Sequence, residues 1–230
     1  MTEEKYFRRI RSFVRREGRL TKGQQRALDE LYPRYGLTPA VNEQFDFAAI
    51  FQNQHPVHLE IGFGNGQTLM SMASAQPAIN FFGIEVHRPG VGNALLQIDK
   101  AALSNVRVIC EDAVEVLKQH IADHSLAAVY IFFPDPWHKK RHHKRRLVQV
   151  EFINLLKQKL SNGARLHMAT DWEAYAEHML HVMSEVEGFT NLAGTGQYSD
   201  KPDYRPLTKF EQRGLRLGHG VWDLVFIKTS

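Results

Sequence analysis

Cysteine is nearly absent from this chain of 230 residues, which contains only Cys110. A single cysteine excludes an internal disulfide and any cysteine-cluster metal site. Apolar runs are short as well: none reaches the roughly 18 residues of a membrane-spanning helix, and the amino terminus lacks the apolar core of a signal peptide. We therefore expect a cytoplasmic protein whose length suits one full α/β domain.

Acidic residues are absent from residues 139–146, which hold six Lys/Arg and two His. Residues 1–26 carry nine Lys/Arg against three Glu, so two short segments provide the positive net charge. Like charges within such a segment repel one another. The segment is either a solvated charge run or a surface that a polyanion neutralises, and we favour contact with nucleic acid phosphates. The candidate contacts are Lys139, Arg141, His142, His143, Lys144, Arg145 and Arg146. Histidine, Asp and Glu do not recur at ligand spacing on a convincing helix, so no metal is expected.

Strand and helix patterns alternate along most of the chain. Strands are predicted over residues 57–61, 80–86, 106–110, 126–133, 164–169 and 221–228. Helices are predicted over residues 42–51 with Asn42 as the cap, 67–75, 90–103, 114–120, 145–160 and after Thr170-Asp171, where Trp172 is placed on the core stripe. This order predicts one doubly wound α/β domain that ends in a strand pair or hairpin.

The two polar ends of the pattern are interpreted separately. Residues 1–35 are expected to form a basic, flexible arm that leads into a docked segment around 28–35, although a disordered solubilising tail is the alternative. Residues 36–230 then form the single domain. Within it, the polar stretch 194–217 is expected to be a long functional loop.

A glycine-rich turn follows the first predicted strand. Its spacing, Gly62-x-Gly64-x-Gly66, differs from the G-x-G-x-x-G of dinucleotide-binding folds. Glu60 lies two residues before the first glycine, where a carboxylate would repel a pyrophosphate. A cofactor with a cationic amino-acid end and no phosphate fits better, and S-adenosylmethionine has both features.

Two further acids follow the next strands. Glu85, at the end of the second strand, is placed to accept hydrogen bonds from ribose hydroxyls. Asp112, after the third strand, is placed to accept one from an adenine amino group. The alternatives are exposed strand-end acids for Glu60 and Glu85, and a helix cap for Asp112.

A proline-bracketed acid follows the fourth strand in the segment Phe133-Pro134-Asp135-Pro136-Trp137. The flanking prolines restrict the backbone, so Asp135 would be held rigidly at the sheet edge where α/β folds bind ligands. A helix cap or turn acid is the alternative. Trp137 either stacks on a flipped base or packs as a wall against the helix that follows.

These motifs resemble those of the bacterial tRNA (guanine-N7)-methyltransferase family. The resemblance spans about residues 57–226. It rests on Leu59-Glu60-Ile61-Gly62-Phe63-Gly64, Gly83-Ile84-Glu85-Val86-His87, the Asp135 segment with its basic run, Thr170-Asp171-Trp172 and Thr208-Lys209-Phe210-Glu211 with the residues up to His219.

The resemblance implies a class I, Rossmann-like methyltransferase fold with a mostly parallel seven-stranded sheet flanked by helices. It implies methyl transfer from S-adenosylmethionine to N7 of guanine 46 in tRNA, by a monomer or homodimer without a metal. Glu60, Gly62, Gly64, Gly66, Glu85, Asp112 and Asp135 would bind the cofactor, with Asp135 also catalytic. Lys139, Asp171, Thr208, Lys209, Phe210 and Glu211 would meet the tRNA.

Two rival hypotheses stay open at this stage. An amino-group methyltransferase acting on adenine or cytosine also carries a proline-flanked Asp beside an aromatic residue. A non-catalytic RNA-binding module on a methyltransferase scaffold would keep the basic segments, but the intact Glu60, glycine turn and Glu85 argue against it.

Overall fold

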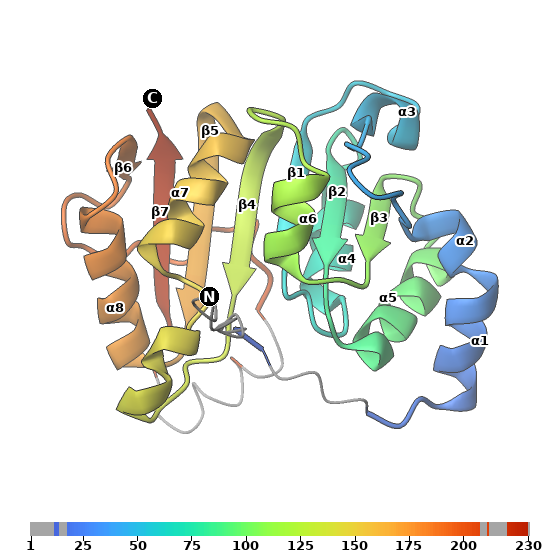
Figure 1. Ribbon diagram of the computed structural model, residues 1–230, viewed down its shortest axis with the longest axis horizontal. Helices are drawn as coiled ribbons and strands as arrows, with labels where there is room; N and C mark the ends of the chain where they lie inside the picture. Colours follow the sequence, from blue (N-terminus) through green and yellow to red (C-terminus); the bar gives the residue numbers. More distant parts are fainter. Residues whose placement is uncertain (1–11, 14–17, 208–210, 212–219, 230) are drawn as a thin grey trace, which may run out of the picture.

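The computed structural model describes residues 12–13, 18–207, 211 and 220–229. In this part of the chain, seven strands form one sheet in the order β3-β2-β1-β4-β5-β7-β6 (Figure 1). The strands are β1 (Val57–Ile61), β2 (Asn80–Ile84), β3 (Val106–Ile109), β4 (Leu126–Phe132), β5 (Leu160–Thr170), β6 (Phe189–Asn191) and β7 (Trp222–Lys228). The first five pair in parallel, whereas β7 lies antiparallel to both β5 and β6. The predicted mostly parallel seven-stranded α/β fold is confirmed.

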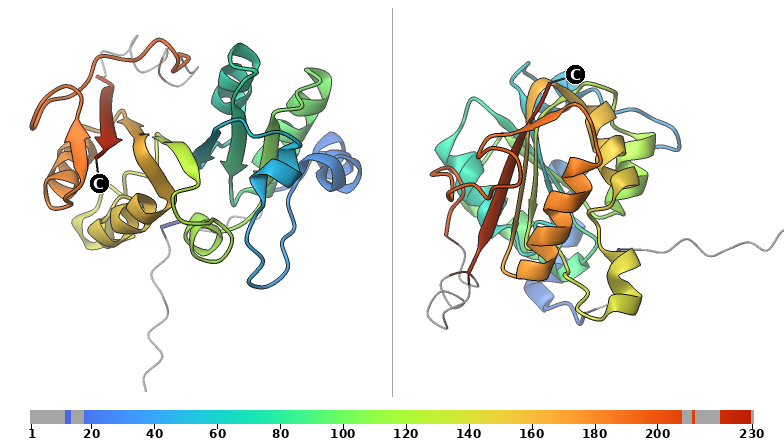
Figure 2. Two further views of the ribbon diagram at one scale, coloured as in Figure 1. Left: turned by 90° about the horizontal axis from the view of Figure 1, so that it is seen from above. Right: turned by 90° about the vertical axis from the view of Figure 1, so that its left-hand side faces the viewer.

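Helices cover both faces of the sheet, as the edge-on view in Figure 2 shows. The helices are α1 (Lys22–Glu30), α2 (Tyr32–Tyr35), α3 (Phe47–Phe51), α4 (Gln67–Ala75), α5 (Arg88–Lys100), α6 (Ala113–Gln119), the 3₁₀ helix η1 (Lys140–Arg145), α7 (Val150–Lys159) and α8 (Glu173–Ser184). One core cluster joins α3, α6, α7 and α8 to the sheet, and a second joins α1, α2, α4 and α5 to it. The fully buried strands β1 and β2 separate these two layers.

The docked part of the amino-terminal segment begins earlier than the sequence indicated. Thr21 and Gln24 form a reciprocal capping box that starts α1, a helix that was not predicted, at Lys22. Ala27 and Tyr35 are buried, and α1 packs along α5. The part of the predicted arm from residue 21 to residue 35 is therefore docked on the domain. Residues 1–11 and 14–17 lie outside the described part of the chain.

Two helix starts also differ from the prediction. Asn42 has a φ of +63° in a turn, and Asp46 caps α3 instead by accepting a hydrogen bond from the Ala49 N–H. The helix predicted over 145–160 begins only at Val150, because Arg146 has an extended backbone after the 3₁₀ turn. The basic run is thus a separate element that stands ahead of α7.

Trp172 was placed on the buried stripe of the following helix, and that placement is wrong. Its backbone is extended (φ −119°, ψ 105°) because it is the N-cap residue of α8, so the helical spacing does not apply to its side chain. Trp172 is 41% exposed. Tyr175, Met179, Val182 and Met183 on the same predicted stripe are buried as expected.

Candidate functional site

The glycine turn between β1 and α4 adopts a backbone that other residues disfavour. Gly62, Gly64 and Gly66 have φ values of +75°, +58° and +82°, in the left-handed region. A Cβ added at Gly66 would lie 2.8 Å from the Cβ of Ala94 in α5, so that position also needs glycine for packing. At Gly62 and Gly64 an added Cβ would meet nothing within 4 Å, so the turn leaves open space beside its backbone.

Glu85, just beyond β2, holds this turn in place. Its Oε2 accepts a hydrogen bond from the Gly64 N–H at 2.8 Å. Its Oε1 accepts from the Val86 and His87 N–H groups at 2.7 and 2.9 Å. The side chain is buried, which rules out the exposed strand-end alternative. Since each carboxylate oxygen can accept two hydrogen bonds, Oε2 keeps acceptor capacity for a ligand hydroxyl.

Glu60 occupies the middle of the sheet in β1 and is only 3% exposed. Among the described residues, its Oε2 has no hydrogen-bond partner. Burial, with a smaller contribution from the charge of Glu85, raises the pKa of Glu60 to about 8. The ligand-free carboxyl is therefore protonated at neutral pH. A buried acid without a partner is unfavourable by itself and would gain most from a cation beside it.

Two adjoining chambers lie at the carboxyl ends of the central strands. The larger, about 740 Å³, is lined by Glu60, the glycine turn and Asp171. The smaller, about 300 Å³, is lined by Glu85, Asp112 and Asp135. Both chambers are lined by Gly62, His87, Phe132 and Phe133. Because they share these walls, we treat them as one cleft, which runs across the sheet edge where α/β folds bind ligands.

The turn that carries Asp135 is fixed from both sides. Phe133 donates its N–H to the Ala169 carbonyl at 2.8 Å, and Arg146 Nε donates to the Pro136 carbonyl at 3.0 Å. Phe133 and Trp137 have φ values of +53° and +47°, a conformation that is uncommon outside glycine. Asp135 itself is exposed and lines the smaller chamber, so the turn presents its carboxylate to the cleft.

Asp112 and Asp171 enter the cleft from two other strand ends. Asp112 Oδ1 accepts from the Val114 N–H at 3.0 Å and so caps α6, which is the alternative that the sequence left open. The same side chain lines the smaller chamber, so its role toward a cofactor stays a prediction. Asp171 follows β5, is exposed, and lines the larger chamber together with Glu60.

The basic run forms an exposed surface next to the cleft. Its exposed cations are Lys139, Lys140, Arg141 and Lys144. His142 and His143 are half-buried, and the pKa of His142 is lowered by desolvation and by neighbouring Arg141 and Arg145. The cationic surroundings thus disfavour the charged form of His142, and the exposed cations of the surface are Lys and Arg.

Arg146 does not belong to this surface. It is 3% exposed, and its guanidinium donates to the carbonyls of Pro136 and Ala174 and lies over the Tyr175 ring at 4.8 Å. The expectation that Arg146 contacts the polyanion does not fit this position, because its donors are turned inward. Arg146 instead supports the turn that carries Asp135.

Trp137 packs against its own chain, as the wall alternative predicted. Its Nε1 donates to the Ser12 carbonyl at 3.0 Å. The His142 ring is stacked on it with the ring centroids 5.8 Å apart, and the Arg145 guanidinium lies 4.8 Å from its centroid. Ser12 and Phe13 also line the smaller chamber, so this part of the arm lies against the site.

Glu211 is the one residue of the Thr208-Lys209-Phe210-Glu211 motif that lies within the described chain. It is buried, and its two oxygens accept hydrogen bonds from Arg205 Nη2 and Nη1 at 2.7 Å each. Arg205 is fully buried and also donates twice to Asp223 in β7, at 2.7 and 2.8 Å. The role of Glu211 toward a substrate stays a prediction, and the structure gives its carboxylate a second task as an anchor.

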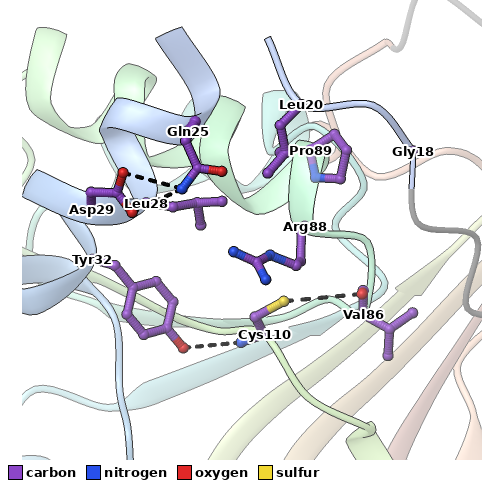
Figure 3. A pocket seen from close by; sticks show the side chains of 10 residues that line it. All are labelled: Gly18, Leu20, Gln25, Leu28, Asp29, Tyr32, Val86, Arg88, Pro89 and Cys110. Carbon is purple, nitrogen blue, oxygen red and sulfur yellow. Dashed lines mark hydrogen bonds between the residues drawn. The ribbon is translucent and has the colours of Figure 1, made fainter. Parts of the chain in front are cut away.

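Another cavity, of about 570 Å³, lies between α1, α2 and the ends of β2 and β3 (Figure 3). Tyr32 Oη accepts from the Cys110 N–H at 3.2 Å at its floor, and Arg88 extends into its centre. It shares Val86 with the smaller chamber. This cavity formed no part of the expectations from the sequence, since α1 was not predicted.

Sequence reasoning also missed several residues of the cleft wall. His87 and Phe133 line both chambers, and Gln24 from α1 lines the larger one and donates to the Pro89 carbonyl at 3.2 Å. Gly90 was not singled out either, although a Cβ there would collide with the Gly64 carbonyl. The Pro89-Gly90 pair after Glu85 was the signal that could have indicated this close approach.

The residues present fit S-adenosylmethionine. The unpartnered Oε2 of Glu60 suits an ammonium group, Glu85 retains acceptor capacity, and the space beside Gly62 and Gly64 gives the ligand access to the backbone. Among the described residues, no three His, Cys, Asp or Glu side chains are grouped to hold a metal ion. None of the helices in the described ranges combines the length and apolarity that crossing a membrane requires.

Comparisons with known proteins agree with this geometry. A tRNA (guanine-N(7)-)-methyltransferase of Aeromonas hydrophila is 60% identical over 226 residues, which cover 98% of this chain and 95% of that protein. The protein of the same name from Sodalis glossinidius is 60% identical over 96% of this chain and 92% of its own length. The solved 16S rRNA methyltransferase KamB superposes with a TM-score of 0.60 at 13% identity, over 85% of this chain and 99% of that one, which shows the shared fold. The family described as "Putative methyltransferase" matches residues 54–224. The chain therefore belongs to the tRNA (guanine-N7)-methyltransferase family, whose methyl donor is S-adenosylmethionine.

Proposed function

We propose that this protein methylates N7 of the guanine at position 46, in the variable loop of tRNA. The observation that carries the proposal is the buried Glu60 carboxyl, whose Oε2 has no hydrogen-bond partner among the described residues, in a cleft that also contains Asp135 and lies next to a cationic surface. The names of the relatives support the same activity. We place the reaction in the cytoplasm, and a monomer or a homodimer would serve it equally.

The residues that would bind the methyl donor are divided between the two chambers. S-adenosylmethionine, when bound, supplies a methyl group on a positively charged sulfur. Glu60 would pair with its ammonium group, and the turn from Gly62 to Gly66 would lie along its amino-acid end. Glu85 would accept from the ribose hydroxyls, and Asp112 from the adenine amino group through the oxygen that does not cap α6.

The chemistry at N7 requires no general base. Guanine N7 has a free lone pair, which forms the new bond to the methyl carbon as the carbon–sulfur bond breaks and its electron pair stays on sulfur. No proton leaves, and the positive charge moves from sulfur to the base. Asp135, held on its fixed turn, would stabilise this charge electrostatically, while the cleft orients the two reactants.

The nucleic acid side combines the exposed basic surface with acids at the cleft mouth. Lys139, Lys140, Arg141 and Lys144 are free to contact phosphates. We assign Asp171 and Thr208, Lys209, Phe210 and Glu211 to contacts with the target nucleotide, with the Arg205 pair holding Glu211 in position. The phosphate contacts of the basic surface would position the tRNA without reading its base sequence.

Labelled S-adenosylmethionine and unmodified tRNA provide the decisive test. We expect label in tRNA, and nuclease digestion with mass analysis should give N7-methylguanosine at position 46. A methylated amino group on adenine or cytosine would support the rival methyltransferase. Tight tRNA binding without any label would support the RNA-binding module.

The salt dependence of tRNA binding tests the cationic surface. Replacing Lys139, Lys140, Arg141 and Lys144 together by Ala should reduce the slope of log affinity against log salt by about 3 to 4, since each phosphate contact contributes roughly 0.7 to 0.9. Filter binding at several salt concentrations measures the slope. Arg146→Gln is the matched control: it removes a cation of the same run, and it should lower stability and leave the slope unchanged, because Arg146 is buried. An unaltered slope in the quadruple variant contradicts the assignment.

A further inference from the structure

Trp172 has the exposure and support of a binding platform. The residue is 41% exposed, whereas its backbone N–H and carbonyl are both hydrogen-bonded. Its N–H donates to Thr170 Oγ1 at 3.2 Å, and its carbonyl accepts from the Tyr175 and Ala176 N–H groups at 2.9 and 3.0 Å. A large apolar ring held on a fixed backbone and left in water gains free energy when a flat partner covers it.

The ring adjoins two segments that carry lining residues of the cleft. Trp172 follows Asp171, which lines the larger chamber with Glu60. Its ring meets that of His138, three residues after Asp135, in a T-shaped contact with the centroids 4.2 Å apart. The pair therefore joins the segments that follow β4 and β5, which also carry the exposed acids Asp135 and Asp171. A T-shaped contact covers at most one face of the indole, so the other stays available.

The other tryptophans are engaged elsewhere. Trp137 is stacked with His142, lies beside Arg145 and donates to Ser12. Trp222 lies in β7, where it meets Tyr198 at 6.5 Å and covers Gly220. Trp172 is the tryptophan whose ring has both the exposure and the location to meet a nucleotide.

We propose that Trp172 stacks on the target guanine and favours the methylated, cationic form of the base over the neutral one. This inference rests on the proposed function and deepens it. A base that gains positive charge at N7 is attracted more strongly to the indole face, and tryptophan is the best aromatic partner for a cation. The contact therefore strengthens as the methyl group is transferred, which helps the reaction and slows release of the product.

Fluorescence of the full-length protein tests the stacking separately from turnover. With S-adenosylhomocysteine present, N7-methylguanosine monophosphate should quench the tryptophan emission at lower concentration than guanosine monophosphate does. The quenching should disappear in Trp172→Phe and persist in Trp222→Phe, the matched control. Quenching that is unchanged in Trp172→Phe overturns the proposal, as does equal affinity for the two nucleotides.

Kinetics provide the second arm. Trp172→Ala should lower kcat/KM for tRNA about tenfold or more, the usual loss for a stacked base, while Trp172→Phe recovers most of it. Trp172→Leu, which keeps an apolar side chain but has no π face, should resemble the Ala variant. Wild-type kinetics in Trp172→Ala overturn the stacking role while wild-type labelling of N7 still upholds the proposed function. Absence of N7 labelling by the wild-type protein instead removes the proposed function.

Discussion

Asp135→Ala is expected to lower kcat at least about 100-fold, the scale on which a single electrostatic contact to a transition state is lost. The side chain is exposed to the cleft and its turn is fixed by Ala169 and Arg146, so its removal deletes a charge and leaves the frame in place. Single-turnover measurements with saturating tRNA and labelled cofactor report this step directly. Affinity for tRNA should change little.

Asp135→Asn separates charge from shape. If the carboxylate acts on the positive charge that develops on the base, the amide should be nearly as slow as Ala, because it accepts hydrogen bonds without a negative charge. Turnover close to that of the wild type in either variant removes the assignment of Asp135. An equal fall in cofactor affinity and kcat would place its effect in binding instead.

Glu60→Gln is expected to weaken cofactor binding by about 100-fold or more, because the bound ammonium would be left buried without its counter-charge. Calorimetric titration with S-adenosylhomocysteine measures this loss. In the wild-type protein, binding at pH 7 should also release a proton, since the pKa of Glu60 is about 8 without a ligand and a cation lowers it. The proton release should disappear in Glu60→Gln, which has no group to ionise there.

The same substitution should stabilise the ligand-free protein at high pH. Because the folded-state pKa lies above the ordinary value of 4.5, the folded chain holds a proton that the unfolded chain releases, and stability falls as the pH rises from about 5 through 8. Glu60→Gln should therefore match the wild type near pH 5 and melt higher near pH 8. Glu187→Gln, an exposed acid outside the cleft, is the control. A variant that binds cofactor normally contradicts the ion pair with Glu60.

The sequence predicted the frame of the site because the relevant signals are local. The run from Val57 to Ile61 and the helix from Gln67 to Ala75 have the predicted bounds, since an apolar run ends at a glycine turn and a helix follows it. Acids placed after parallel strands necessarily gather at one edge of the sheet. Hence Glu60, Glu85, Asp112 and Asp135 line one cleft.

What the sequence did not show depends on the direction of single side chains. Arg146 reads as one more cation in a basic run, yet carbonyls distant in sequence draw it inward. Trp172 fits a helical stripe by spacing, but its N-cap backbone turns it toward water. Residues 22–27 were predicted to belong to the free part of the arm, because the partner on which α1 docks, α5, lies far along the chain.

The fully buried Arg205 also constrains how this protein can diverge. One guanidinium donates to both Asp223 and Glu211, so loss of Arg205 leaves two buried carboxylates without these donors, and loss of either acid leaves buried guanidinium N–H groups without their acceptor. An alignment of relatives should show these three positions either fixed or replaced as a set. A relative in which only one of them is replaced would lack the buried ion pairs that connect β7 to Arg205 and Glu211.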